Sequence, residues 1–330
     1  MILRFLLLLA FALVAPDPTP FNHPDLSSLT SPRAGDTAAL DLVHRTPADL
    51  LLPALLDALE SSPEFQPGQP AADRAIHALV LLQEPANPAR FADQRRFDAL
   101  IDAMDWSATN RLRILQILPA ADPVFAPRVR ELLAAAIESE NALEVIAAFQ
   151  TGAASFGFDA ESLPRLREYV RDPSEANPAA WAAATKETFM NVQPTELKAG
   201  AIHALLVSSK NPADELALIA SLPPQDADAV GRALLTLPIT RQEVLLGLPV
   251  DARTQYLGLI EKALMSPASR RFVEGDAFGC LAYLAGLNDP AMPAAARRIA
   301  TSMVAAHPDP ANAGKLAHFL EALSGPSRDR

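Results

Sequence analysis

The chain has 330 residues, of which 50% are hydrophobic, and a formal net charge of −11. Its length allows about two domains, and an acidic surface repels phosphate backbones, so the charge excludes nucleic acid as a partner. Aromatic residues make up only 6% of the chain, and much of the apolar content is Ala and Leu, which favours helices over strands.

Residues 1–15 predict an export signal. Arg4 supplies a positive charge, and Phe5 to Ala15 form an unbroken apolar run, which is shorter than the roughly 20 residues of a membrane-spanning helix. Ala10-Phe11-Ala12 is a candidate cleavage motif. We therefore expect a signal peptide and a periplasmic or extracellular protein. The alternative is an uncleaved N-terminal anchor facing outside the cytoplasm, in which case only this segment contacts the membrane.

The rest of the chain divides into three predicted parts. Residues 16–36 are rich in Pro, Ser, Thr and Asp without an apolar period, and are expected to form a linker. Residues 37–323 carry apolar residues at helical spacing nearly throughout and are expected to form one helical-repeat domain. Residues 324–330 form a polar C-terminal tail. The polar segment 171–178 breaks the helical period and is expected to be a loop inside the domain.

Many prolines mark helix starts. A side-chain oxygen before the proline can cap the first free N–H groups, and proline at the first helical position lacks only a donor that would have no helical partner. Thr240-Arg241-Gln242-Glu243 adds a capping box before an apolar run. The pairs with a capping residue before proline are Thr46-Pro47, Asn87-Pro88, Asp122-Pro123, Asn177-Pro178, Asn211-Pro212, Ser266-Pro267, Asp289-Pro290 and Asp309-Pro310.

The block Ala-Ile-His-Ala-Leu occurs twice, as Ala75–Leu79 and as Ala201–Leu205. Its two isoleucines, Ile76 and Ile202, are separated by 202 − 76 = 126 residues, about three times 42, and paired-helix repeats have periods of roughly 40–47 residues. The repeat predicts stacked antiparallel helix pairs in which the two isoleucines hold equivalent core positions. Such stacks expose long binding surfaces.

Two Asp-Pro turns resemble those of HEAT-type repeats: Asp122-Pro123-Val124 precedes Arg128-Val129, and Asp289-Pro290 precedes Arg297-Arg298-Ile299. The duplicated block and Gly279–Leu284 resemble the second helix of such a unit. The resemblance covers about residues 37–323 and implies an all-α solenoid that acts as a scaffold, adaptor or binding subunit, with no shared catalytic residues. The alternative fold is an irregular all-α domain, or two of them.

No catalytic, cofactor-binding or metal-ligating residues are predicted, and no cofactor is expected. The six histidines form no zinc-protease motif, and the single Cys280 excludes a cysteine-rich zinc site and is expected in the core. The chain has neither a hydrolase elbow nor a phosphate loop, and Gly152 is expected to end a helix in the left-handed conformation. The acidic pair Asp226 and Asp228 and the acids of 138–144 are expected at solvated helix ends.

Trp181 is the strongest candidate for an interface, because the alanines around it leave its side chain prominent on its helix. His77 and His203 hold equivalent places in the duplicated block and are further interface candidates; otherwise they are structural histidines on a helix face. The expected function is an exported, non-catalytic scaffold that binds another protein. The alternatives are an all-α enzyme with dispersed active-site residues and a membrane-tethered structural subunit of an envelope complex.

Overall fold

The computed structural model describes residues 24–31, 35, 37–82, 94–186 and 193–324. Within these ranges every regular element is a helix, which confirms the predicted all-α fold. The predicted export signal, the Asn87-Pro88 helix start and the tail after Ser324 lie outside the described residues. The chain forms two compact units, divided between Glu84 and Pro85, so the expected repeat domain of 37–323 is distributed over both.

Unit 1 is built around its last helix. Its elements are α2 (Ser27–Thr30), α3 (Thr37–Arg45), α4 (Ala48–Ser61), the 3-10 turn η1 (Pro63–Phe65) and α5 (Pro70–Leu81). Helix α5 packs against α2, α3 and α4, and its Ile76 and Leu79 are fully buried.

Part of the predicted linker 16–36 is packed structure in unit 1. Helix α2 falls inside it, and Leu29 of this helix is fully buried. The guanidinium of Arg74, on α5, donates to the carbonyl of Leu29 at 2.6 Å. The burial of Leu29 and this hydrogen bond together fix α2 against α5. The Pro, Ser and Thr content of the segment does not predict this packing.

Unit 2 contains the remaining helices. In chain order they are α6 (Gln94–Ala103), α7 (Ala108–Ile117), α8 (Ala126–Ala136), α9 (Ala142–Ala154), α10 (Leu163–Arg171), α11 (Pro173–Ala176), α12 (Pro178–Lys186), α13 (Pro194–Ser208), α14 (Pro212–Ala220), α15 (Ala227–Thr240), α16 (Gln242–Leu246), α17 (Val250–Met265), α18 (Arg270–Glu274), α19 (Ala277–Ala285), α20 (Met292–Ala306) and α21 (Pro310–Ser324). Five 3-10 turns accompany them: η2 (Leu118–Ala120), η3 (Pro123–Phe125), η4 (Ala160–Ser162), η5 (Pro224–Asp226) and η6 (Pro267–Ser269). The polar segment 171–178 holds α11 within this unit and does not divide it.

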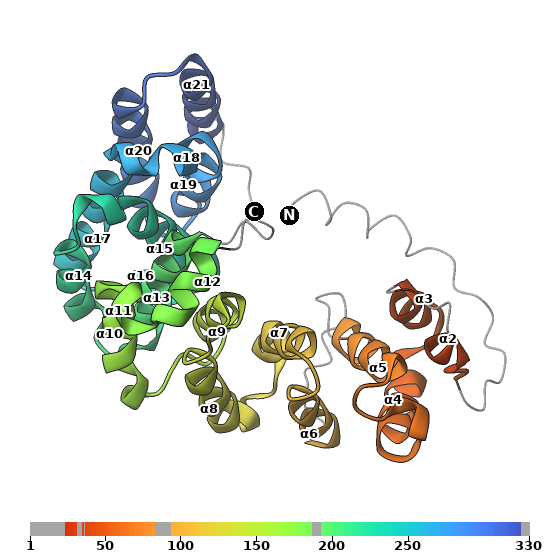
Figure 1. Ribbon diagram of the computed structural model, residues 1–330. Coiled ribbons are helices and arrows are strands. Elements are labelled where there is room, and N and C mark those ends of the chain that lie inside the picture. The colour runs from red at the N-terminus through yellow and green to blue at the C-terminus, as the bar shows by residue number, and fades with distance from the viewer. Residues whose placement is uncertain (1–23, 32–34, 36, 83–93, 187–192, 325–330) are drawn as a thin grey trace. The chain divides into compact units, whose positions relative to one another are not determined.

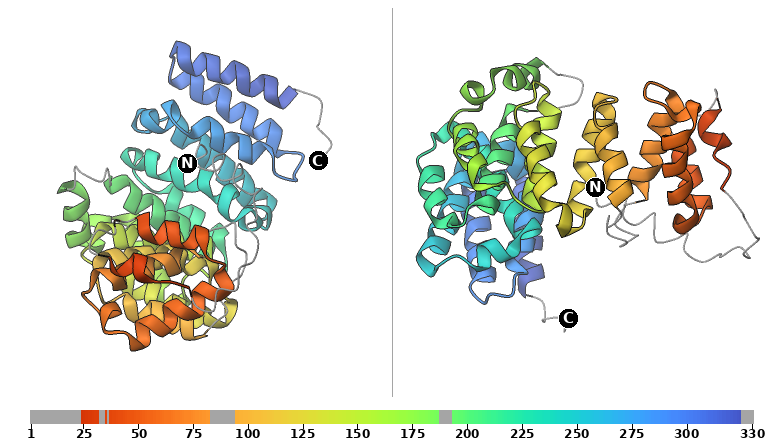
Figure 2. Two further views of the ribbon diagram at one scale, coloured as in Figure 1. Left: turned by 90° about the vertical axis from the view of Figure 1, so that its right-hand side faces the viewer. Right: turned by 90° about the horizontal axis from the view of Figure 1, so that it is seen from below.

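The helices of unit 2 pack in a regular succession (Figure 1). Helices α7, α9, α13, α15, α19 and α21 each contact the next one in this order. On their flank, α14, α17 and α20 contact one another in turn, and cross contacts join α8 to α9, α10 to α13, α14 to α13, α17 to α15 and α20 to α19. Figure 2 shows the same elements from two further sides. The core of unit 2 is therefore continuous along the succession.

Helices α9 and α13 approach closely because a glycine faces an aromatic ring. A β-carbon added at Gly200 would lie 3.0 Å from the Cβ atom of Phe149, which is tighter than ordinary van der Waals contact. The Phe149 ring meets the ring of Tyr169, on α10, edge-on at a centroid distance of 5.1 Å. Edge-to-face packing of this kind is favourable for aromatic side chains.

The turn after α9 corrects one prediction. Gly152 lies inside α9, and a β-carbon there would lie 2.3 Å from the ring of Phe158. The left-handed residue is Gly157, with φ 69°, and its N–H donates to the carbonyl of Gly152 at 2.9 Å. Position 152 thus needs glycine because the Phe158 ring leaves no room for a side chain, whereas position 157 needs glycine because its φ angle is positive.

Side-chain caps before proline are confirmed at most of the predicted helix starts. The side-chain oxygens of Asp122, Asn177, Ser266, Asp289 and Asp309 each accept a hydrogen bond from a backbone N–H two or three residues ahead. Helices or 3-10 turns begin directly after Asp122, Asn177, Ser266 and Asp309, as the pairs predict, whereas α20 begins only at Met292, after a turn that follows Asp289.

Two of the predicted caps before proline are absent. The side chain of Asn211 donates to Asp214 at 2.7 Å and accepts no backbone N–H. The side chain of Thr46 makes no cap either, because Pro47 stands in the cap position and α4 begins one residue later.

The predicted capping box at Thr240 is wrong, because Thr240 is the last residue of α15. Its hydroxyl lies 2.9 Å from Nε2 of His203 and also donates to the carbonyl of Thr236. Helix α16 follows Arg241, whose guanidinium pairs with Glu243. The hydroxyl therefore contacts α13 and its own helix and does not cap the next helix.

Helix α15 contains an interior proline, and a tyrosine from α17 compensates for it. Pro238 has no N–H, so the carbonyl four residues earlier, that of Leu234, receives no helical hydrogen bond. The hydroxyl of Tyr256 donates to this carbonyl, and both residues are fully buried. Burial raises the pKa of Tyr256 well above its usual value, so the hydroxyl keeps its proton.

Replacing Tyr256 with phenylalanine is expected to lower the free energy of unfolding by about 1–3 kcal/mol, because a buried carbonyl loses its partner. In a Pro238→Ala background the cost should shrink, since alanine supplies the missing N–H. Urea unfolding of the wild-type protein, the two single variants and the double variant measures the coupling free energy between Tyr256 and Pro238 as a double-mutant cycle. Tyr283→Phe, at a side chain that is 58% exposed, is the control. Equal costs in both backgrounds would show that the tyrosine does not compensate for the proline.

Candidate binding pocket at Trp181

One of the three candidate interface residues lines a pocket. Trp181 is half-buried on α12 and forms part of the wall of a cavity in unit 2. His203, on α13, is not part of that lining. His77 is half-buried on α5 and belongs to unit 1.

His203 is an interior residue with a structural hydrogen bond. Its side chain is only 8% exposed, and its Nε2 atom lies 2.9 Å from the hydroxyl of Thr240. Burial lowers the pKa of His203 to about 4, and the positive charge of Arg241 adds to this effect. A neutral imidazole thus connects α13 to the end of α15 and is not presented to a partner.

The Trp181 pocket has a volume of about 430 Å³, within the range of roughly 300–1,000 Å³ that is usual for binding cavities. It is formed where the end of α10, the short helices α11 and α12, the start of α13 and the turn η5 meet. The residues that line it are Arg171, Asp172, Pro173, Ser174, Trp181, Pro194, Thr195, Lys198, Pro223, Gln225, Asp226 and Ala229.

A buried ion pair forms one wall of the pocket. The ammonium of Lys198, on α13, donates to Asp226 at 2.7 Å and to the carbonyl of Arg171 at 3.1 Å. Lys198 is 8% exposed. A cation at the carbonyl end of a helix is favoured by the helix dipole, and here it ties the end of α10 to the turn before α15.

Asp172 is fixed by its own turn. Its carboxylate accepts from the hydroxyl of Ser174 at 2.6 Å and from the Ser174 N–H at 2.9 Å. The hydroxyl bond, the backbone bonds and the charge of Lys198 hold the pKa of Asp172 below its ordinary value. The carboxylate is therefore ionised at neutral pH and committed to capping α11.

Three polar groups at the pocket have no partner among the described residues. The hydroxyl oxygen of Thr195 is buried and makes no hydrogen bond. Arg171 is exposed, and neither its guanidinium nor the indole N–H of Trp181 has a partner within the ranges that the structure describes. Buried polar atoms in proteins are nearly always hydrogen-bonded, so the Thr195 oxygen is an exception in the wall of this pocket.

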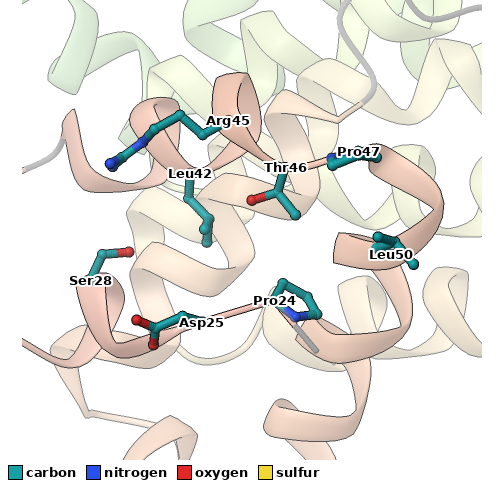
Figure 3. A pocket seen from close by; sticks show the side chains of 8 residues that line it. All are labelled: Pro24, Asp25, Ser28, Leu42, Arg45, Thr46, Pro47 and Leu50. Atoms are coloured by element: carbon teal, nitrogen blue, oxygen red, sulfur yellow. The ribbon is translucent and has the colours of Figure 1, made fainter. Parts of the chain in front are cut away.

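Unit 1 has a pocket of its own, with a volume of about 290 Å³ (Figure 3). Figure 3 shows the Leu42 side chain between those of Ser28 and Thr46. The hydroxyl of Ser28 is buried without a partner, but the wall is largely apolar and carries no buried ion pair. The residues that line this pocket are Pro24, Asp25, Ser28, Leu42, Arg45, Thr46, Pro47 and Leu50.

A further cavity of unit 2, of about 460 Å³, lies at the opposite ends of α10 and α13. Its arginines are already neutralised. Arg167 makes a two-point contact with the buried Glu215, at 2.6 and 3.1 Å. Arg130 lies 3.4 Å from Asp159 and donates to a backbone carbonyl. The Trp181 pocket is the better candidate, because its lining contains a tryptophan and a buried hydroxyl oxygen without a partner.

Asp226 and Asp228 stand at the N-terminal end of α15, as predicted, but they are paired and not simply solvated. Asp226 pairs with Lys198, and Asp228 is 6% exposed and accepts from Arg232 at 2.8 Å. Sequence reasoning found Trp181 but missed these charged groups around it. The signal available was Lys198 itself, the one lysine of a helix that is otherwise mostly apolar, which must have a partner if that helix is buried.

The prediction for 138–144 is wrong in part, because Glu144 is 4% exposed and accepts from Ser139 at 2.8 Å. Glu138 is exposed and pairs with Arg165.

Cys280 is half-buried and less enclosed than predicted. Burial raises the pKa of its thiol to about 11, so the thiol stays protonated at neutral pH.

Two kinds of feature are absent from the described residues. No group of three or more His, Cys, Asp and Glu side chains there is placed to hold a metal ion. Among the helices of the same ranges, none combines the length and the apolar character needed to cross a membrane.

Comparison with known proteins gives no assignment. No family model matches the chain, and no curated protein or solved structure matches it. The chemistry of the Trp181 pocket must therefore be judged from its own residues.

Proposed function

We propose that the protein is an exported, non-catalytic scaffold or adaptor that binds a segment of another protein at the Trp181 pocket. The observation that carries this proposal is the pocket, which combines a half-buried tryptophan, an exposed arginine without a partner and a buried hydroxyl without a partner. Tryptophan and arginine are the side chains most enriched at the energetic centres of protein interfaces.

The proposed architecture is an α-solenoid of stacked helix pairs, as in HEAT-type repeats. Its support is the succession of contacts in unit 2, in which α9, α13, α15 and α19 each pack on the next, with α10, α14, α17 and α20 on their flank. In such stacks each repeat contacts its neighbours, and the turns of successive repeats follow one another along an edge. The Trp181 pocket lies at turns of this kind, which an extended partner segment can reach.

The test is capture of a partner from the envelope and secreted fractions of the producing cells, with the mature chain as bait. We expect a protein that the wild-type chain and a Tyr283→Ala variant retain, and that a Trp181→Ala variant loses by tenfold or more. Tyr283 is an exposed aromatic residue of α19, outside the pocket, and is the matched control. Retention of every captured protein by Trp181→Ala would contradict the proposal, provided that circular dichroism shows both variants folded.

Export is tested by the N-terminus of protein recovered from cells. We expect it to begin between Phe11 and Asp17, because cleavage follows small residues at the end of the apolar run. Recovery from the membrane fraction with Met1 intact would favour the anchored alternative. Intact Met1 in the soluble cytoplasmic fraction would contradict both.

A further inference from the structure

We propose that the Trp181 pocket recognises a single acidic side chain next to an apolar residue in an extended segment of the partner. This inference rests on the proposed function, because it specifies the chemistry of the segment that the scaffold binds.

Among the charged side chains that line the pocket, only that of Arg171 has no polar partner in the described part of the chain. The wall contains two acids, Asp172 and Asp226, and two bases, Arg171 and Lys198. Asp226 and Lys198 neutralise each other at 2.7 Å, and Asp172 is engaged with Ser174. The guanidinium of Arg171 remains without a partner in the described part of the chain.

A guanidinium fits a carboxylate better than any other common peptide group. It presents five N–H donors in a planar fork that bonds both oxygens of a carboxylate at once. A phosphate offers the same geometry, but its second negative charge would lie near the ionised carboxylate of Asp172, and like charges at an interface are unfavourable. The net charge of −11 opposes a run of acids for the same reason. One carboxylate satisfies Arg171 with the least repulsion.

The apolar rings in the lining of the pocket favour an apolar residue next to the acid in the partner segment. The ring of Trp181 and the rings of Pro173, Pro194 and Pro223 line the same cavity. An apolar side chain beside the acid can cover these rings and exclude water from the ion pair, which strengthens it.

The experiment uses Trp181 as its own reporter. In the full chain with Trp106→Phe, Trp181 is the only tryptophan, and its fluorescence is titrated with the peptide Ac-Ala-Phe-Glu-Ala-NH2. We expect a saturable change in emission, and at least tenfold weaker binding of the peptide with Gln in place of Glu. Arg171→Gln should abolish the preference for Glu. Arg297→Gln, at an exposed arginine of α20 outside the pocket, should leave the preference intact.

Several results would overturn this inference. Equal binding of the Glu and Gln peptides, or an unchanged preference in Arg171→Gln, would remove the role of Arg171. Tighter binding of a phosphoserine peptide, or of a peptide whose only carboxylate is its C-terminus, would name a different ligand. If no peptide changes the Trp181 emission, but the Trp181→Ala variant still fails to capture the partner, this inference is wrong and the proposed function stands. Peptide binding as expected, with no Trp181-dependent capture, would count against the proposed function alone.

Discussion

Replacing Ile202 with alanine is expected to lower the free energy of unfolding of unit 2 by about 2–5 kcal/mol, through lost apolar burial and the cavity that remains. Ile202 is fully buried on α13, which packs on α9, α10 and α15. Both tryptophans, Trp106 and Trp181, belong to unit 2. Tryptophan fluorescence during urea unfolding therefore follows this unit, and its midpoint should fall.

Ile76→Ala should cost a similar amount in unit 1, where Ile76 is fully buried on α5. Because unit 1 has no tryptophan, the change should appear in circular dichroism, and the fluorescence midpoint should stay in place. The two costs should nearly add in the double variant, as they do for distant sites. Val250→Ala, at a side chain that is 76% exposed, is the control. If Ile202→Ala leaves the free energy of unfolding unchanged while Ile76→Ala lowers it strongly, the duplicated block is a coincidence.

Stability should fall as the pH is lowered from neutral toward 4, and His203 should account for about 3 kcal/mol of the fall. The pKa of His203 in the folded protein is lowered from 6.5 to about 4, so between these values the unfolded chain binds the proton and the folded chain does not. The contribution is therefore fully present above pH 6.5 and is lost as the pH falls through 4. Urea unfolding at a series of pH values measures it.

The control for this prediction is the difference between variants. His203→Gln removes the titrating group, so its stability relative to the wild-type protein should rise as the pH falls. His318→Gln, at an exposed histidine of α21, should follow the wild-type curve. If the difference in the free energy of unfolding between the wild-type protein and His203→Gln stays constant from pH 7 to 4, the pKa of His203 is not lowered in the folded protein.

Local sequence predicted the features that depend on neighbouring residues. Asp122 and Asp309 cap the helices that follow them because the cap, the proline and the first turn lie within a few residues. The burial of Ile76 and Ile202 follows from apolar periodicity in the same way. His77 is half-buried and His203 is buried, although their blocks are identical, so the local sequence does not predict this difference. His203 also lies beside Thr240, which is 37 positions away along the chain.

The Trp181 pocket was predictable only in part for the same reason. Trp181 is prominent among alanines in the sequence, but the bond between Lys198 and Asp226 joins residues 28 positions apart. Helix packing also brings Lys198 to the carbonyl of Arg171, 27 positions earlier. Periodicity shows that α13 is apolar without showing which turn meets its one lysine. The chemistry of the pocket is therefore a product of tertiary structure.

The hydrogen bond from Tyr256 to the carbonyl that Pro238 leaves free constrains how these positions can evolve. If the tyrosine is lost first, the buried carbonyl has no donor, and selection acts against that intermediate. If the proline is lost first, the new residue brings its own N–H, and the tyrosine hydroxyl can still share the carbonyl, which accepts two bonds. Homologous chains are thus expected to carry tyrosine without proline, but rarely proline without tyrosine. The tyrosine should therefore be gained before the proline and lost after it.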